Sequence, residues 1–365
     1  AAARAGADVR VVVLHRPLPS LAVLRSGPGA TVRALANGLR QPRETELDGL
    51  DVRYVKFVSP PRPMSYERWG AWAAPTLAAA LRRLRSRFPF DLVHAHNAVP
   101  AGDAVRRARL DVPTVVSVHG GDVLHTARRG SRGRAAVERA LGAARLTLAN
   151  SSGIERLARE HGAHETRLVH LGADVMRHAP SAPARPALVT VGHLVARKRH
   201  DDVIRALAAL ADRHPDLRYV VIGDGPEHGR LAALADSLGV GGRVELRGQV
   251  TPDAALVEMA SASLFVMPST DEALGVAYLE AMGAGVPAIG VRGEPGPEDI
   301  AAAGPGLELV DAGDVAGLAA RIDELLSDAA GLRALGEGAR ETVATHFTWE
   351  RCGAATLDAY RAALR

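Results

Sequence analysis

Short apolar runs alternate with longer amphipathic segments along nearly the whole 365-residue chain. The short runs are rich in Val, Ile and Leu, as expected of buried strands. They cover residues 9–14, 51–56, 91–95, 114–118, 146–149 and 166–170, and then 187–191, 218–222, 244–246, 264–267, 288–291 and 306–310. Strands that alternate with helices predict parallel sheets joined by crossover helices, and therefore an α/β fold.

The segments between these runs predict the helices and one break between domains. Apolar residues at helical spacing predict helices over 69–88, 101–109, 132–143, 152–161, 201–213, 227–238, 253–260, 275–284, 315–327, 329–346 and 349–364. Residues 179–186 contain three prolines, which exclude a helix or a central strand there. We therefore predict one α/β domain over 1–180, a linker over 179–186 and a second α/β domain over 187–347.

The first residues do not begin a doubly wound domain in the usual way. Residues 1–8 are typical of the end of a helix followed by the strand 9–14, whereas such a domain opens with a strand and a Gly-rich turn. We therefore expect one strand and most of one helix to precede residue 1 in the parent protein, and we expect their loss to affect activity.

Composition narrows the class of protein. The chain is 47% hydrophobic and 24% charged, a normal balance for a soluble globular protein. Cys352 is its single cysteine, which excludes an internal disulfide framework and fits a reducing compartment. No apolar run reaches the ~18–20 residues of a membrane span and no signal peptide is visible, so a cytoplasmic location is expected.

Charge is distributed unevenly between the two halves. Residues 1–180 hold 28 Lys and Arg against 15 Asp and Glu, a net of +13, whereas residues 181–365 hold 17 against 26, a net of −9. A basic half favours an anionic partner surface, and an Arg-rich proteome is the alternative explanation. Nucleic acid is not predicted as a partner because no nucleic-acid motif accompanies the arginines. The basic amphipathic segment 69–88 is a candidate for peripheral contact with an anionic membrane, although such stripes more often pack on a sheet.

The segment 271–287 is the most informative part of the chain. Glu272 and Glu280 stand eight positions apart, before the helix stop Gly285-Val286-Pro287. If the helix begins near Gly275, Glu272 lies in the preceding loop, and the free N–H groups of Leu274, Gly275 and Val276 can hold an anion or sugar hydroxyls. The alternative is a loop before a buried Ala-rich helix, with two solvated acids.

This segment, with its Ala281-Met282 and Gly285-x-Pro287 continuation, closely resembles the Glu-x7-Glu motif of the retaining glycosyltransferases of family 4. The resemblance implies the GT-B fold, in which two Rossmann-like domains face each other across a cleft, and a C-terminal helix, here 348–365, that returns to the first domain. It also implies a catalytic position for Glu272, which would bind donor sugar hydroxyls or lie near the anomeric carbon, and it implies that Glu280 binds ribose hydroxyls. Family members carry Phe where this chain has Leu274.

Two further turns of the second half fit the same resemblance. In the turn 191–198, Lys198 matches the family's diphosphate-binding lysine, His193 stands where the family has an arginine, and Arg197 is a possible substitute. A surface turn is the alternative, although cations at a helix start oppose the helix dipole unless an anion binds. Gly223, in Gly-Asp-Gly-Pro, resembles the family's turn beside the donor site, and by itself it is only a tight turn.

Two strand ends of the first half supply the remaining candidates. His119, in His119-Gly120-Gly121-Asp122, matches the family's His-Gly-x-Asp, which implies a catalytic position near the transferred sugar. The resemblance places His96 and Asp122 on the acceptor side, and Asp122 as a helix N-cap is the alternative. His94 and His96 lack a third ligand at metal-binding spacing, so no metal site is predicted.

These residues and the resemblance together imply a metal-independent glycosyltransferase, and the resemblance implies that it retains the anomeric configuration. The donor is expected to be a nucleotide-diphosphate sugar, and the acceptor a carbohydrate or lipid-linked hydroxyl of bacterial cell-surface polysaccharide or glycolipid synthesis. No cofactor is expected, because Lys198, Arg197 and the helix start at Gly275 would neutralise the leaving diphosphate. The competing hypotheses are an inactive nucleotide-sugar-binding remnant and a nucleotide-sugar epimerase of the same architecture.

Overall fold

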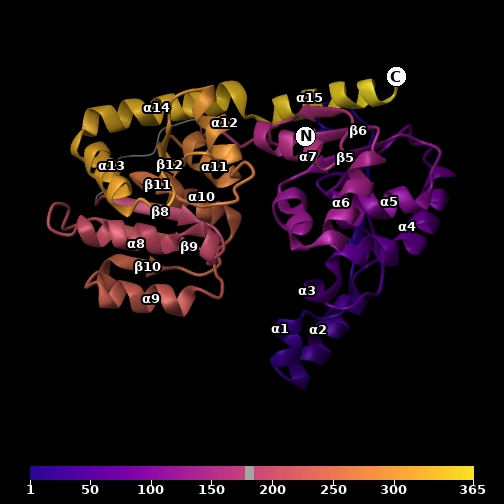
Figure 1. Cartoon of the computed structure of the whole chain (residues 1–365), viewed down its shortest axis with the longest axis horizontal. Helices are drawn as coiled ribbons and strands as arrows, with labels where there is room; N and C mark the ends of the chain where they lie inside the picture. Colours follow the sequence, from indigo (N-terminus) through magenta and orange to yellow (C-terminus); the bar gives the residue numbers. More distant parts are fainter. Residues whose placement is uncertain (177–184) are drawn as a thin grey trace. The chain divides into compact units, whose positions relative to one another are not determined.

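The computed structural model describes residues 1–176 and 185–365, apart from the side chains of Ala22 and Pro63, and divides the chain into two compact units (Figure 1). The first unit holds Ala1–Val169 and Gly353–Arg365, and the second holds His170–Cys352. Most of the predicted linker, residues 179–184, lies outside the described residues.

The observed boundary precedes the predicted one at residue 180, because residues 170–176 are bonded to the second unit. The His170 ring lies 3.0 Å from the Asp299 carboxylate. The N–H of Ala173 donates to the carbonyl of Phe347, and that of Met176 donates to the carbonyl of Gly283.

The first unit contains two sheets, where the strand pattern had predicted one parallel sheet. One sheet has the order β1-β3-β2 and the other β4-β5-β6-β7. Their strands are β1 (Arg10–His15), β2 (Glu44–Leu47), β3 (Leu50–Lys56), β4 (Val93–His96), β5 (Thr114–Val118), β6 (Leu146–Ala149) and β7 (Thr166–Leu168). All their pairings are parallel except β2 with β3.

The unpredicted strand β2 follows from a hairpin turn. Asp48 and Gly49 join β2 to β3, and both have positive φ angles, 50° and 75°. Asp-Gly is a preferred pair for a two-residue turn of this kind, since it matches the twist of antiparallel strands. The strand was not predicted because its residues are polar and exposed, so the apolar pattern carries no signal there.

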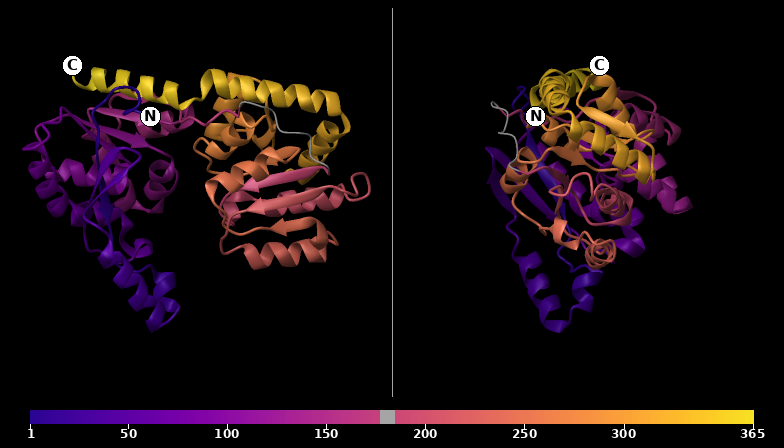
Figure 2. Two further views of the ribbon diagram at one scale, coloured as in Figure 1. Left: turned by 180° about the vertical axis from the view of Figure 1, so that it is seen from behind. Right: turned by 90° about the vertical axis from the view of Figure 1, so that its left-hand side faces the viewer.

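Helices cover the sheets of the first unit, with one exception. They are α1 (Leu21–Arg25), α2 (Pro28–Arg40), α3 (Arg62–Ser65), α4 (Trp69–Arg85), α5 (Asp103–Ala108), α6 (Ser131–Gly142) and α7 (Ser152–Glu160). The pair α1 and α2 extends away from the body of the unit (Figures 1 and 2), and α2 buries none of its residues.

The apolar stripe of α4 faces the protein interior. Ala73, Leu77 and Leu81 are buried, while Arg82 and Arg85 donate to the carbonyls of Ala108 and Asp111. The stripe predicted as a candidate for membrane contact is therefore occupied by packing, and only the arginine face of this helix is open to a partner.

The second unit has one six-stranded sheet with the order β10-β9-β8-β11-β12-β13, and every pair in it is parallel. Its strands are β8 (Ala187–Val191), β9 (Arg218–Ile222), β10 (Val244–Leu246), β11 (Leu264–Val266), β12 (Ala288–Val291) and β13 (Leu307–Val310). All lie within one residue of their predicted bounds. Their Val-, Ile- and Leu-rich character is that of strands buried on both faces.

Successive residues of these strands feed two separate cores. Val189, Val220 and Phe265 belong to one cluster, whereas their neighbours Leu188 and Val221 belong to the other. Helices on both faces complete the layers (Figure 2). They are α8 (His200–Ala209), α9 (His228–Ser237), α10 (Pro252–Ala260), α11 (Val276–Gly283), α12 (Pro295–Ala303), α13 (Val315–Ser327) and α14 (Ala329–His346), and α15 (Trp349–Ala363) then passes into the first unit.

Candidate functional site

The second sheet has a switch point between β8 and β11. From β8 the chain proceeds outward to β9 and β10, and from β11 it proceeds in the other direction to β12 and β13. In open α/β sheets, ligands bind at the carboxyl ends of the strands beside such a point. The turn after β8 carries Arg197 and Lys198, and the loop after β11 carries Glu272, so topology alone brings these predicted residues together.

Glu272 is the centre of a buried charge cluster. Its Oε2 accepts from Lys198 Nζ at 2.6 Å and from Ser269 Oγ at 2.9 Å. Lys198 and Glu272 are only 8% and 9% exposed. Burial at this level strengthens the attraction between the two charges. It also makes the loss of either partner destabilising, because the other charge stays buried without it.

Arg197 is the second cation beside the Glu272 carboxylate. Its Nη1 lies 3.6 Å from Glu272 Oε2, is itself buried, and has no hydrogen-bond partner within the described residues. Two cations therefore face one carboxylate, and one guanidinium nitrogen is unsatisfied. Since buried polar groups are nearly always paired, this nitrogen indicates a place for an anionic ligand.

The start of α11 adds backbone donors beside this cluster. Gly275 is the N-cap residue, and its φ of 79° is in the left-handed region. Within the described part of the chain, the N–H groups of Leu274, Gly275 and Val276 make no hydrogen bond. Such groups bind anions and hydroxyl oxygens. Leu274 is 1% exposed and packs in the core.

Glu280 lies on α11, half-buried, and has no ion pair or hydrogen bond within the described residues. Burial, and secondarily the charge of Asp174, raise the pKa of Glu280. A half-buried carboxylate without a partner is well suited to accept hydrogen bonds from the hydroxyl groups of a ligand.

Gly223 and His193 lie at the neighbouring strand ends. A Cβ at Gly223 would lie 2.0 Å from the Gly192 carbonyl, and its φ is 139°, so this position requires glycine for close packing of the two turns. His193 is exposed, and its ring lies 3.4 Å from the Asp224 carbonyl. Lys198 and Arg197 reach Glu272, whereas no contact of His193 with this cluster is present.

Two residues that hold the cluster had no sequence signal of their own. Ser269 shares Glu272 Oε2 with Lys198, and Glu294 accepts from the Glu272 N–H at 2.8 Å. Glu294 is 22 positions from Glu272, and only the arrangement of β11 beside β12 brings the two together. The one general feature of the sequence that could have indicated such residues is a polar residue just after a central strand.

In the first unit, three imidazoles stack at the carboxyl ends of β4 and β5. The ring centroids of His94 and His96 lie 4.4 Å apart, and those of His96 and His119 lie 5.4 Å apart. His96 Nδ1 and His119 Nε2 are 3.1 Å apart. Burial, assisted by neighbouring histidines, lowers the pKa of His94 to about 3 and that of His119 to about 4. These rings are therefore neutral at pH 7 and act as hydrogen-bonding groups rather than as cations.

His94 is fully occupied within the protein, because its two ring nitrogens lie 2.7 Å from Tyr360 Oη and from Ser117 Oγ. Among the residues that the structure describes, no group of three or more His, Cys, Asp or Glu is arranged to hold a metal ion. Over the same residues, no helix is both long enough and apolar enough to span a bilayer.

Asp122 is buried, with only 1% of its surface exposed. Its Oδ1 accepts from the N–H of Val99 at 3.2 Å, and its Oδ2 has no partner among the described residues. Asp122 therefore holds the segment that follows His96 instead of capping a helix, and its carboxylate does not face an open acceptor site. Desolvation raises the pKa of Asp122 to about 6.

This shift predicts that Asp122→Asn stabilises the first unit at neutral pH. A raised pKa means that the carboxyl group contributes most stability below pH 3.8, and that this contribution is lost as the pH rises towards 6. The neutral amide avoids this loss, so we expect a gain of up to about 3 kcal/mol at pH 7.5 that shrinks as the pH falls to 5. Thermal melts of Asp122→Asn and of Asp91→Asn, an exposed acid of the same unit, check this. A gain independent of pH, or an equal gain in both variants, would contradict it.

Comparisons with known proteins agree with this geometry. Residues 1–177 match the family model described as Glycosyltransferase Family 4, and residues 176–342 match that of Glycosyl transferases group 1. The chain is 30% identical over 311 residues to a GDP-mannose-dependent alpha-(1-6)-phosphatidylinositol monomannoside mannosyltransferase of Mycolicibacterium smegmatis, covering 77% of this chain and 78% of that protein.

Two other proteins illustrate the range of similarity. A lipopolysaccharide core biosynthesis glycosyltransferase, LpsE of Rhizobium meliloti, is 34% identical over 175 residues, which cover 48% of each chain. The solved structure of sucrose-phosphate synthase from Thermosynechococcus elongatus superposes with a TM-score of 0.76 at 21% identity, covering 96% of this chain and 98% of that one. Similarity at this identity shows a shared fold, which is the GT-B fold expected from the sequence.

Proposed function

Because this chain belongs to the family 4 glycosyltransferases, we propose that it transfers a sugar from a nucleotide-diphosphate sugar to an acceptor hydroxyl with retention of the anomeric configuration. The observation that carries this proposal is the charge cluster at the β8–β11 switch point. There, Arg197 and Lys198 face the single carboxylate of Glu272, and one guanidinium nitrogen is unsatisfied.

The cluster supports a role for each residue in donor binding. Arg197, Lys198 and the N–H groups of Leu274, Gly275 and Val276 would neutralise the diphosphate. Glu272, once Lys198 turns to the diphosphate, would accept hydrogen bonds from the donor sugar. Glu280 would accept hydrogen bonds from the ribose hydroxyls.

The chemistry follows from neutralisation of the leaving group. The bond between the anomeric carbon and the diphosphate oxygen breaks, and the acceptor oxygen bonds to the same face of that carbon. The acceptor proton passes to the departing diphosphate oxygen. Neutralisation by fixed side chains and a helix start is the role that Mg²⁺ fills elsewhere, so we propose that the reaction needs no metal.

The acceptor side is proposed for the first unit. His96 and His119 are neutral imidazoles that can bind an acceptor hydroxyl, with His119 nearest the reacting group in this proposal. The net charge of +13 over residues 1–180 and the lipid acceptors in the names of relatives favour an anionic or lipid-linked acceptor. Peripheral contact with an anionic membrane remains our hypothesis, and equal co-sedimentation with anionic and neutral liposomes would contradict it.

Nucleotide binding gives the direct test. We expect UDP, GDP or ADP, or one of their sugars, to raise the melting temperature, because a ligand of the native state stabilises it by mass action. The shift should survive EDTA. In the Glu280→Ala variant we expect roughly 10- to 100-fold weaker binding, since hydrogen bonds to a charged group are lost.

The control for this test is Glu337→Ala, which removes an exposed acid from α14 of the same unit. It should bind like the wild type. A protein that binds none of these nucleotides would overturn the whole proposal. A protein that binds them only when a divalent metal is added would overturn its metal-independent part.

A further inference from the structure

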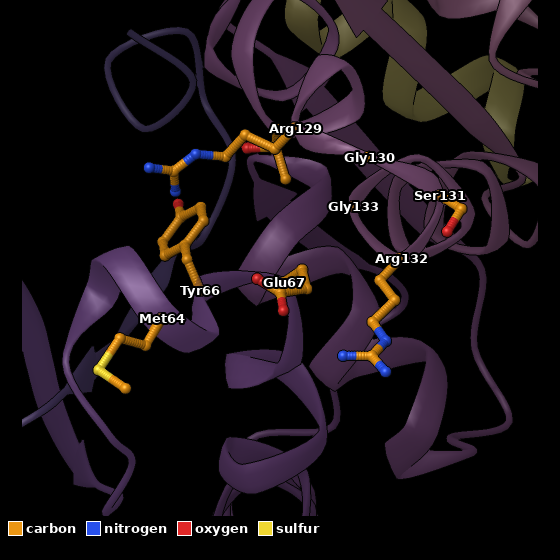
Figure 3. Close-up of a pocket in the computed structure, with 9 residues that line it drawn as sticks. Met64, Tyr66, Glu67, Arg129, Gly130, Ser131, Arg132 and Gly133 are labelled. Atoms are coloured by element: carbon orange, nitrogen blue, oxygen red, sulfur yellow. The ribbon is translucent and has the colours of Figure 1, made fainter.

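A polar cavity lies within the first unit. It has a volume of about 510 Å³, and among the residues that line it are Tyr66, Glu67, Thr126, Arg129 and Arg132 (Figure 3). Met64 lies at its edge and is 72% exposed. We call this cavity the basic pocket.

The arginines of the basic pocket lack carboxylate partners. Within the described residues, the side chains of Arg129 and Arg132 make no ion pair or hydrogen bond, so no acid neutralises either guanidinium group. Glu67 is the one acid of the lining, so the pocket retains a positive charge. Unpaired guanidinium groups that line a cavity form a binding site for a phosphate or carboxylate.

The backbone at the pocket adds to this positive potential. α6 begins at Ser131, its N-cap residue Gly130 supplies no side-chain cap, and its first turn contains no acid. Arg132 and Arg134 lie in that turn, where cations oppose the helix dipole. This arrangement is unfavourable in an empty site and becomes favourable when an anion binds.

The walls of the basic pocket are tied to the acceptor-side histidines. Tyr66 Oη donates to the Val99 carbonyl at 2.9 Å, and Val99 follows His96 by three positions. Thr126 Oγ1 donates to the Gly121 carbonyl at 3.1 Å, and Gly121 follows His119 by two positions. An acceptor held in the pocket is therefore close to the segments that carry these two histidines.

An apolar groove also lies in the first unit, and part of its lining directly precedes α3 in the chain. It has a volume of about 460 Å³ and is lined mainly by Leu18, Leu24, Val58, Pro60, Pro61 and Trp72. Only α3 separates Pro61 from Tyr66 of the basic pocket. Val58 is 69% exposed and Leu24 is 44% exposed, which is unusual for a surface without an apolar partner.

We propose that the basic pocket binds a phosphate group of a lipid acceptor and that the apolar groove holds part of its hydrocarbon chain. This inference rests on the proposed function and specifies its acceptor as a phospholipid. Arg129 and Arg132 bind the phosphate oxygens, and Glu67 accepts a hydrogen bond from a neighbouring acceptor hydroxyl. An anionic head beside an apolar chain matches the charge of the pocket and the exposed aliphatic side chains of the groove.

The test uses the whole chain and three soluble probes measured by calorimetry, namely dihexanoyl phosphatidic acid, dihexanoyl phosphatidylcholine and inorganic phosphate. We expect phosphatidic acid to bind most tightly. Arg129→Gln/Arg132→Gln should weaken that binding roughly 10- to 100-fold, because two charge-assisted hydrogen-bonding groups are lost. The control Arg139→Gln/Arg156→Gln removes the same charge from exposed positions of the same unit, outside both the pocket and the segment 69–88, and should bind like the wild type.

A variant of the apolar groove distinguishes binding of the hydrocarbon chain from binding of the phosphate group. Leu24→Ser/Val58→Ser should weaken binding of phosphatidic acid and leave that of inorganic phosphate unchanged. If the groove variant has no effect while the arginine variant does, the phosphate comes from a soluble ligand and the lipid part is overturned. Equal losses in both arginine doubles, or equal binding of phosphatidic acid and phosphatidylcholine, would overturn the phosphate site.

Nucleotide binding, measured on the same samples, tests the proposed function separately from this inference. Nucleotide binding belongs to the second unit, so its melting-temperature shift should be the same in the wild type and in Arg129→Gln/Arg132→Gln. Phosphate binding without any nucleotide shift would leave the basic pocket standing and remove the donor site.

Discussion

Lys198→Met is expected to lower the free energy of unfolding by about 3–5 kcal/mol and to lower sugar transfer by roughly 10²- to 10³-fold. Lys198 Nζ lies 2.6 Å from Glu272 Oε2, and both residues are nearly fully buried. Removing the ammonium group leaves the buried Glu272 carboxylate with a hydrogen bond from Ser269 and with Arg197, 3.6 Å away, as its one remaining cation. The desolvation cost of that carboxylate then destabilises the second unit.

The double variant Lys198→Met/Glu272→Gln separates stability from function. A neutral amide beside a neutral thioether removes the buried carboxylate, and the Arg197 side chain, 35% exposed, keeps its charge partly solvated, so most of the stability should return. Transfer should remain low, because neither the diphosphate cation nor the donor-sugar carboxylate is present. Urea denaturation followed by circular dichroism, with hydrogen exchange of β8 and β11, measures the first effect, and a transfer assay measures the second. Wild-type stability in Lys198→Met, or recovered transfer in the double variant, would contradict this account.

Gly275→Ala is expected to destabilise the second unit by roughly 2–5 kcal/mol and to abolish donor binding. Its φ of 79° costs an L-residue about 1–2 kcal/mol. A Cβ there would also lie 2.4 Å from Cδ2 of the Tyr278 ring, which is completely buried, so a backbone shift must follow. That shift displaces the N–H groups at the start of α11.

Gly239→Ala is the matched control, since it has nearly the same φ, 73°, with nothing within 4 Å of the added Cβ. It measures the backbone cost alone, about 1–2 kcal/mol. The difference between the two melting temperatures therefore reports the clash with Tyr278. Equal shifts in both variants would show that the turn at Gly275 accommodates a side chain. They would contradict the expectation that contact with Tyr278 destabilises the variant.

The fold of the second unit could be predicted almost completely from the order of residues. Each strand is a continuous apolar run and each helix has a 3.6-residue period, so local pattern and tertiary environment agree. The first unit departs from prediction at β2, whose polar residues pair with β3 through the Asp48-Gly49 turn. Its helices α1 and α2 were also not predicted. In α2, none of the residues is buried.

The site was predictable as a set of residues but not as an arrangement. Spacing placed Glu272 before a helix and Glu280 on it, and resemblance connected Lys198 with a diphosphate. The pairing of Lys198 with Glu272 spans 74 positions in sequence, and it exists because β8 and β11 are neighbours in the sheet. Strand order is a tertiary property, since loop-closure and packing energies decide it rather than local pattern.

The sequence alone therefore determined the α/β class, the elements of the second unit except the unpredicted helix α12, the family, and the residues Arg197, Lys198, Glu272 and Glu280 as donor-site candidates. Tertiary structure decided that Arg197 keeps an unsatisfied buried nitrogen and that Asp122 is enclosed by the core. It also decided that the exposed residues Arg129 and Arg132 line one cavity. The physical reason is that periodicity records which face of an element is buried, whereas partners, desolvation and cavities arise only where separate elements meet.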